Sequence, residues 1–186
     1  FMARLHTHAE SLRLPPEIQP KRWDKVFYYP DEKAVYHLPQ YRALFSDERI
    51  ALMDAAVQKL DAFLPTLYAN GGPPILIHGD LHPWNVHVYR GQLYVLDFED
   101  NLLGYPVQDI AVTLYYGRER PDYPELAAAF RAGYTRLRPW PARSEEELRL
   151  LMAARNTNFI NYIAEIDPDA ESFLEGMFTR LKGFLE

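Results

Sequence analysis

Two short stretches decide how this chain of 186 residues is interpreted: His78-Gly79-Asp80-Leu81-His82-Pro83-Trp84-Asn85 and Leu96-Asp97-Phe98-Glu99-Asp100. Between them, two strand-like runs (86–89 and 93–96) flank Arg90-Gly91-Gln92, which is typical of a hairpin with a three-residue loop. With Gly91 at the centre of that loop, we expect Asn85 to face Asp97. Directly opposed residues on antiparallel strands have Cβ atoms roughly 4.5–5.5 Å apart. The hairpin therefore predicts an amide oxygen beside a carboxylate.

This pair of hard oxygen ligands suits Mg²⁺. Magnesium usually takes one or two protein groups and completes its octahedron with water and substrate phosphate oxygens, so a site with only Asn85 and Asp97 implies a phosphate ligand. Asp80 lies in the loop that leads from a predicted buried strand, Ile75 to Ile77, into the hairpin. A carboxylate at that place can orient and deprotonate an attacking hydroxyl. A base with two magnesium ligands is the minimum set for phosphoryl transfer.

Outside the motif the sequence predicts mostly helix, so the expected fold class is mostly α with one small β-hairpin region (α+β). Helical spacing of apolar residues, cap residues and flanking prolines predict helices over residues 2–12, 46–64, 107–116, 122–135, 144–166 and 169–186. Residues 15–45 form an excursion rich in proline and aromatic residues, which is too aromatic for a disordered linker. Its aromatic side chains are expected to pack in a core rather than to form a cation cage.

Composition excludes several kinds of site. The net charge is −6 and no basic run stands out, which argues against a nucleic-acid or anionic-membrane surface. The chain has no cysteine, hence no disulfide, thiolate zinc site or cysteine nucleophile. No apolar stretch approaches the ~20 residues of a membrane span. A cytoplasmic protein that binds neither nucleic acid nor membrane is the expectation.

The motif also resembles a known family. The pattern His78-x-Asp80-x-x-x-x-Asn85, with Asp97 twelve residues later, is similar to the catalytic loop and metal motif of protein kinases and their small-molecule relatives. Gly79 and the wording HGDLHPWN resemble the branch that contains aminoglycoside phosphotransferases, choline kinases and homoserine kinases of type II. The resemblance continues through residues 104–111, is clearest over 75–111, and includes Ala3-Arg4-Leu5-His6, which is similar to the first helix after the family's hinge.

The resemblance implies that residues 1–186 are the C-terminal catalytic lobe of a protein-kinase-like fold, with the N-terminal lobe absent. Asp80 would be the catalytic base, Asn85 and Asp97 the Mg²⁺ ligands, and His78 and Asp109 supports of the catalytic loop. The implied activity is transfer of the γ-phosphate of ATP to a hydroxyl of a small molecule. The family's glycine-rich loop, phosphate-binding Lys and its Glu partner precede the hinge. We therefore expect the isolated chain to be inactive and to self-associate through the surface that the missing lobe would cover.

Three matters stay open at this stage. The acceptor can be an aminoglycoside, a choline-like amine, a homoserine-like amino alcohol or a sugar, and Arg155, Asn158 and Tyr162 are nominated as its contacts. A metal-dependent hydrolase is an alternative function, and its site would use the set His78, Asp80, His82 and Asp97. A non-catalytic scaffold with a kinase-like shape is the other alternative. For Asp109, a plain helix-dipole role in a first turn competes with support of the loop.

Overall fold

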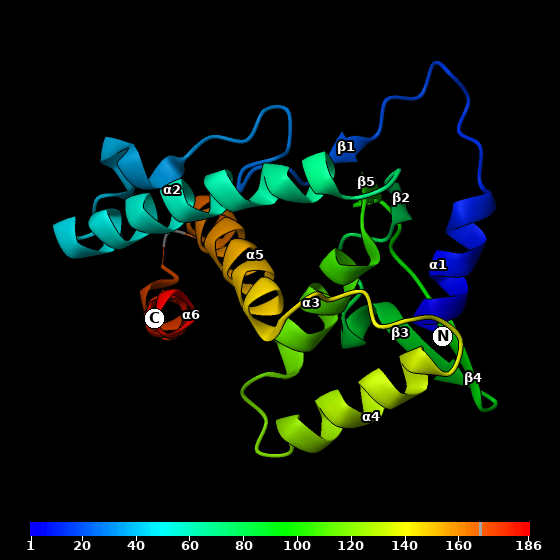
Figure 1. The fold of residues 1–186 in the computed structure, drawn as a ribbon. Helices are drawn as coiled ribbons and strands as arrows, with labels where there is room; N and C mark the ends of the chain where they lie inside the picture. The colour runs from blue at the N-terminus through cyan, green and yellow to red at the C-terminus, as the bar shows by residue number, and fades with distance from the viewer. Residues whose placement is uncertain (168) are drawn as a thin grey trace. The chain divides into compact units, whose positions relative to one another are not determined.

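The computed structural model describes residues 1–167 and 169–186, and it is mostly helical, as the sequence predicts (Figure 1). The helices are α1 (Met2–Ser11), α2 (Asp47–Asn70), α3 (Pro106–Gly117), α4 (Tyr123–Thr135), α5 (Glu145–Ile166) and α6 (Glu171–Leu185). The strands are β1 (Lys21–Arg22), β2 (Ile75–Ile77), β3 (Val86–Tyr89), β4 (Gln92–Val95) and β5 (Leu102–Gly104). Short 3₁₀ turns occur at Val35–His37, Pro39–Tyr41 and Pro83–Asn85. None of the described helices combines the length and the apolar character that crossing a membrane requires.

The chain divides into two compact units. The motif unit consists of Phe1–Arg22 and Gly71–Leu148, and it contains every strand named above together with α1, α3 and α4. The helical unit consists of Trp23–Asn70 and Arg149–Glu186, and it contains α2, α6 and most of α5. All five residues predicted to act as base, metal ligands or loop supports lie in the motif unit.

A small sheet that the sequence did not predict leads into the motif, because its strand β2 ends directly before His78. Its strand order is β1-β5-β2, with β5 parallel to β1 and antiparallel to β2, and Leu102 is paired with both Lys21 and Ile77. Ile77 and Leu102 are buried. Strands of two or three residues are too short to show a period of two, and β2 was recognised only because Ile75, Leu76 and Ile77 are all apolar. The sheet delivers the chain from Ile77 directly into His78.

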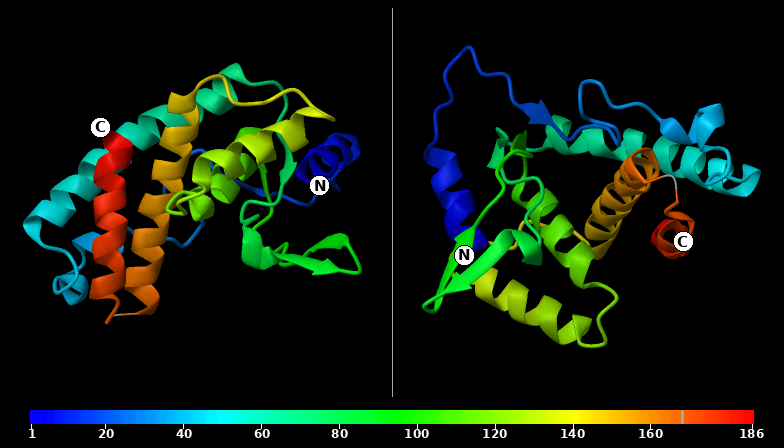
Figure 2. Two further views of the ribbon diagram at one scale, coloured as in Figure 1. Left: turned by 90° about the horizontal axis from the view of Figure 1, so that it is seen from below. Right: turned by 180° about the vertical axis from the view of Figure 1, so that it is seen from behind.

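The hairpin β3–β4 forms, but the predicted register is wrong by one residue. The loop has two residues, Arg90 and Gly91, with φ values of 49° and 74°, so that Gln92 pairs with Tyr89 and Val95 with Val86. Positive φ at both central residues is typical of a type I′ turn, whose twist matches that of the flanking strands. Asn85 is therefore opposite Leu96 rather than Asp97. In the left view of Figure 2 the hairpin extends away from the helices of its unit.

Helix α3 positions the motif because it is apolar on most sides. Pro106 occupies its first turn, and the Gln108 side chain accepts a hydrogen bond from the Tyr105 N–H at 2.8 Å. Its buried residues include Val107, Ile110 and Leu114. A helix buried all round is anchored by its packing, so Asp109 in its first turn is held inside the unit.

From Trp23 onward, the aromatic excursion packs as a core element of the helical unit, as expected. Trp23, Tyr28, Tyr36 and Phe45 are buried. Two asparagines of α5 bind its backbone. Asn161 accepts from Val35 N–H and donates to the Lys33 carbonyl, each at 2.8 Å, and Asn158 donates to the Val26 carbonyl at 3.3 Å. Because buried backbone groups need partners, these amides hold an irregular segment in one conformation.

Glu32 in this segment predicts a pH dependence of stability. Its carboxylate accepts from Tyr29 N–H at 3.3 Å and from the Asn158 amide at 2.7 Å. Burial raises the pKa of Glu32 to about 7 from 4.5, and the nearby Glu165 adds to the effect. The folded state therefore holds this proton more tightly than the unfolded state. The resulting stability is complete below about pH 4.5 and is lost as the pH rises through about 7.

We expect Glu32→Gln, which mimics the protonated acid, to remove this dependence. The stability of the wild type relative to the variant should fall between pH 4.5 and pH 7, in urea unfolding monitored across the pH range. Asp31→Asn is the matched control, since Asp31 is the exposed neighbour in sequence. A wild-type-minus-variant difference that stays constant over this range would contradict the prediction.

Candidate active site

The first part of the motif is held by the buried carboxylate of Asp109. Oδ1 accepts the Gly79 N–H at 2.8 Å, and Oδ2 accepts the His78 N–H at 3.1 Å. Asp109 is completely buried. A carboxylate that only complemented the helix dipole would face solvent in the first turn, whereas this one satisfies two backbone donors of the motif. The contacts therefore favour the loop-support role over the dipole role.

His78 connects the two halves of the motif through both ring nitrogens. Nδ1 accepts the Asp80 N–H at 3.3 Å, so the ring proton of the neutral tautomer is on Nε2, which donates to the Leu96 carbonyl at 3.0 Å. The bond between His78 and Leu96 thereby joins the loop that carries Asp80 to the segment that carries Asp97. His78 is buried and has a structural place in the loop.

Gly79 is required by the path of the loop. Its φ is +80°, and a Cβ at this position would collide with the carbonyl oxygen of Asp100. Only glycine adopts this conformation freely and allows so close a backbone approach. The glycine lets the loop that carries Asp80 cross directly over the segment that follows Asp97.

Asp80 and Asn85 form one hydrogen-bonded unit. The Asn85 amide nitrogen donates to the Asp80 carbonyl at 2.9 Å and lies 3.5 Å from its carboxylate oxygen Oδ2. Asn85 is 8% exposed. Because the amide nitrogen is used in this way, the amide oxygen is the atom that can ligate a cation.

Asp97 follows the hairpin directly and is exposed. The Leu96 N–H donates to the Asn85 carbonyl at 3.0 Å, so Asp97 is one residue beyond the position opposite Asn85. Its φ of 62° takes it out of the alternation of the strand. Non-glycine residues with such a φ are uncommon, and Asp is among the types that tolerate it. The donor set of one amide oxygen and one carboxylate fits Mg²⁺ by its chemistry.

Two further residues lie around the motif: His82, which the sequence assigned only to the hydrolase alternative, and Lys21, which it did not assign. His82 Nε2 lies 3.2 Å from Asp80 Oδ2, and the His82 ring contacts Tyr116 and Trp84 at centroid distances of 4.6 and 5.4 Å. Lys21 of β1 donates to the Glu99 carbonyl at 3.3 Å and lies 3.5 Å from Asp100. The lysine thus offsets part of the negative charge that follows Asp97. The Lys21 contact has no sequence signature, because it joins segments that are 78 and 79 positions apart and meet only in the fold.

The hydrolase alternative loses one of its ligands. Both nitrogens of His78 are bonded to backbone groups, so this imidazole has no lone pair for a metal. In residues 1–167 and 169–186, no group of three or more His, Cys, Asp and Glu side chains is arranged to hold a metal ion. The proposed magnesium site has only two protein ligands, Asn85 and Asp97, so it is not a cluster of that kind.

The residues nominated for acceptor contacts belong to the helical unit. The Asn158 amide is bonded to Val26 and Glu32, so it has a structural role there. Tyr162 is 51% exposed and stacks on Phe159, and the Arg155 guanidinium lies over the same ring. For Arg155, Asn158 and Tyr162, acceptor binding stays a prediction.

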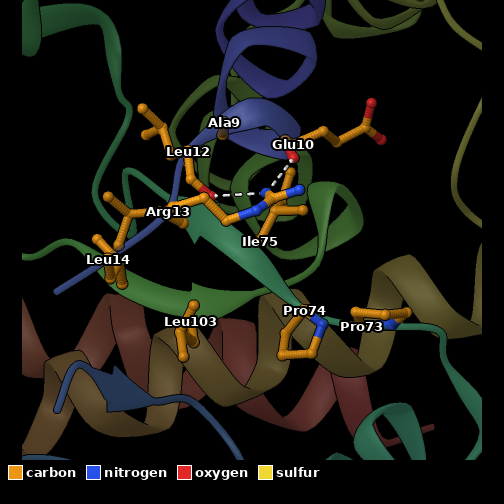
Figure 3. Close-up of a pocket in the computed structure, with 10 residues that line it drawn as sticks. Ala9, Glu10, Leu12, Arg13, Leu14, Pro73, Pro74, Ile75 and Leu103 are labelled. Carbon is orange, nitrogen blue, oxygen red and sulfur yellow. Dashed lines mark hydrogen bonds between the residues drawn. The ribbon is translucent and has the colours of Figure 1, made fainter. Parts of the chain in front are cut away.

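A pocket of about 330 Å³ also lies in the motif unit, away from the motif (Figure 3). It is lined by the end of α1, residues 12–14, Pro73 and Pro74, β2 and Leu103. Figure 3 shows Arg13 bonded to the carbonyl oxygens of Glu10 and Leu12, so its guanidinium caps the end of α1. No residue predicted to act in catalysis lines this pocket, and the candidate active site is therefore the open surface around Asp80.

Comparisons with known proteins identify the fold and the family of the chain. The chain resembles the structure of the amicoumacin kinase hAmiN in complex with AMP-PNP, Ca²⁺ and Ami, with a TM-score of 0.73 and 16% identity. It also resembles a microcompartment-associated aminopropanol kinase (TM-score 0.68, 21% identity) and a thermostable mutant of aminoglycoside phosphotransferase APH(4)-Ia (TM-score 0.53, 18% identity). At these identities the likeness shows the fold.

The matches cover 98% of this chain and 56% and 57% of the first two structures, and 80% of this chain and 47% of the third. The chain thus spans about half the length of the proteins it resembles. No curated protein sequence matches it. The model of the phosphotransferase enzyme family matches residues 1–149, which include the whole motif and its supports. The chain therefore belongs to the phosphotransferase enzyme family.

Proposed function

We propose that the whole protein transfers the γ-phosphate of ATP to a hydroxyl of a small molecule, with Asp80 as general base and Asn85 and Asp97 as magnesium ligands. The observation that carries the proposal is the hydrogen bond of the Asn85 amide nitrogen to the Asp80 backbone, 2.9 Å long. It makes the base and one metal ligand parts of a single rigid element. In phosphoryl transfer, catalysis consists mostly of positioning and charge neutralisation.

Asp80 would take the proton of the acceptor hydroxyl as its oxygen bonds to the γ-phosphorus. The bond from that phosphorus to the bridging oxygen breaks, and ADP leaves. The side chain of Asp80 is 16% exposed, so a substrate can reach it. Its backbone is held by His78 and Asn85. The general base is therefore accessible on a supported loop.

Asn85 and Asp97 would hold Mg²⁺ through one amide oxygen and one carboxylate. The ion, when bound, neutralises negative charge on the phosphate oxygens. Two protein ligands suffice because phosphate and water fill the remaining positions. The left-handed conformation of Asp97 supports this role, since backbone strain of this kind clusters at functional sites.

The acceptor that we propose carries an amino group as well as a hydroxyl. The names of the aminopropanol kinase and the aminoglycoside phosphotransferase that this chain resembles support this class. The net charge of −6 is compatible with a cationic substrate. Because ATP is the donor, we propose a cytoplasmic location.

One face of the hairpin suits the lobe that would complete the enzyme. Val88 and Leu93 are directly paired, and Val86 and Val95 form the next pair on the same face. Val88 is 71% exposed and Leu93 45%. Exposed aliphatic patches on protein surfaces mark interaction sites. We propose that the N-terminal lobe of the whole protein covers this face and supplies the groups that grip the ATP phosphates.

Replacing the base tests the proposal first. Asp80→Asn in the whole protein should lower kcat by on the order of 10²–10⁴ while the affinity for ATP changes little, because a general base acts on the chemical step. Steady-state kinetics with aminopropanol and aminoglycoside acceptors measures both quantities. Asp122→Asn, an exposed carboxylate in the same unit, is the control. Near-normal turnover by Asp80→Asn would refute the assignment.

Replacing the metal ligand has a different expected result. Asp97→Ala should abolish magnesium-dependent turnover almost completely and weaken binding of AMP-PNP in the presence of Mg²⁺, because phosphate charge would lack its counterion. Calorimetric titration with and without Mg²⁺ separates this effect from loss of fold, and Asp122→Ala is the control. Unchanged binding and turnover would exclude Asp97 as a ligand.

The 186 residues alone should fold, self-associate and fail to turn over Mg-ATP. Sedimentation should detect association that is lost in the double variant Val88→Lys, Leu93→Lys. His87→Lys is the control, since His87 lies on the opposite face of the same strand. A monomeric wild-type chain would contradict the proposed exposed interface, and robust phosphoryl transfer by this chain would contradict the need for a further lobe.

A further inference from the structure

A buried line of hydrogen bonds runs behind the catalytic loop through three helices. The Tyr134 hydroxyl of α4 is 2.9 Å from Nδ1 of His6 on α1, and Nε2 of His6 is 3.1 Å from Oδ2 of Asp109 on α3. His6 and Asp109 are completely buried, and Tyr134 is 4% exposed. Neither His6 nor Tyr134 has a part in the proposed chemistry. His6 nevertheless contacts the carboxylate that holds the loop, and Tyr134 is linked to that carboxylate through His6.

The chemistry of the three groups sets the direction of each bond. An ionised carboxylate only accepts, so Nε2 of His6 carries a hydrogen and donates it to Asp109. In the neutral ring, Nδ1 then has a lone pair and accepts the Tyr134 O–H. The hydrogen bond made by one ring nitrogen selects which nitrogen is protonated. Tyr134 therefore selects the tautomer of His6 that can serve Asp109.

Asp109 needs this donor because it is buried. Its carboxylate receives three N–H groups, from Gly79, His78 and His6. An ionised group away from water is tolerated only when its hydrogen bonds are satisfied. With His6 removed, Oδ2 keeps only the His78 N–H. The carboxylate then turns or admits water, and the two backbone N–H groups that it holds lie just before Asp80.

Neighbouring contacts hold α1 against the C-terminal end of α4. Arg138, one turn after Tyr134, donates to Glu10 at 2.6 Å and to Thr7 at 3.2 Å. The Trp140 ring packs edge-on against Tyr134 with a centroid distance of 5.8 Å. The Tyr134 end of the line is thus fixed by packing, and α1 is joined to the end of α4 by an ion pair outside the line.

We propose that His6 is a positioning residue for phosphoryl transfer, with Tyr134 fixing its ring, and that it acts by holding Asp109 and through it the backbone of His78 and Gly79. The proposal rests on the proposed function of Asp80. Misplacement of a catalytic group by about 1 Å costs on the order of 10² in rate. Loss of a residue that orients a metal ligand through a hydrogen bond commonly costs about 10–100-fold in activity, and His6 acts on the loop in a similar indirect way.

The kinetic test uses the whole protein with Mg-ATP and aminopropanol. His6→Leu should lower kcat about 10–100-fold with little change in KM for either substrate, since the substrates' own contacts stay. His6→Gln, whose amide can still donate to Asp109, should recover part of the loss. Tyr134→Phe, which deletes one hydroxyl, should show a smaller loss of the same kind. His8→Leu, on the exposed side of α1, should match the wild type.

A second measurement does not need turnover. Nitrogen NMR of the His6 ring should show Nε2 protonated and Nδ1 bare, and Tyr134→Phe should disturb that pattern. Amide hydrogen exchange at His78 and Gly79 should accelerate in Tyr134→Phe and His6→Gln, both of which are conservative enough to fold, while amides of the hairpin keep their rates.

The outcomes separate the two proposals. An inactive wild type would refute the proposed function, and the exchange rates would still decide the role of His6. An active wild type with His6→Gln and Tyr134→Phe equal to it in kcat and in exchange at His78 and Gly79 would overturn the inference. Equal losses in kcat for His6→Leu and His6→Gln, with altered KM, would also overturn it, because they indicate general damage to the fold.

Discussion

The interaction on which the rest depends is the pair of hydrogen bonds from the backbone of His78 and Gly79 to the buried carboxylate of Asp109. The chain leaves the small sheet at Ile77 and must turn at once, so these two N–H groups cannot join a strand or a helix. Unpaired buried backbone donors are rare because they lose the hydrogen bonds that water provided. One carboxylate supplies both acceptors, and a buried helix keeps it in place.

The motif contains two kinds of residue. Some hold the loop in its conformation, and others have side chains that a ligand can reach. The ring of His78 and the glycine at 79 determine the path of the loop, and both are committed to backbone contacts. Asp80 and Asp97 have accessible side chains. The left-handed conformations at residues 79 and 97 are strained or restricted states that persist only where the surroundings determine them. Here those surroundings are the bonds to Leu96 and the close approach of Asp100.

Much of the fold was readable from the sequence. Five of the six helices were predicted within two residues of their bounds because their apolar positions recur with helical spacing and cap residues mark their ends. Helix α2 was predicted to end at Leu64 but continues through Pro65 to Asn70. Ser46 and Ser144 both accept backbone bonds at the starts of α2 and α5, as such residues do. Strands β1 and β5 were not readable, because segments this short carry no periodicity and, unlike β2, are not wholly apolar runs. The hairpin register was misassigned because nothing in the local sequence states that Arg90 adopts positive φ.

The sequence by itself determined the identity, order and spacing of the residues around the motif, which sufficed to predict a helical kinase-like lobe and to name Asp80, Asn85 and Asp97. These features are local, since all three residues lie within a loop and a hairpin of some twenty residues. Only the tertiary structure decided what lies behind them. His6 is separated from Asp109 by 103 positions and from Tyr134 by 128. Contacts between such distant residues leave no pattern in the sequence. They exist because three helices close around one charge that must be satisfied once water is excluded.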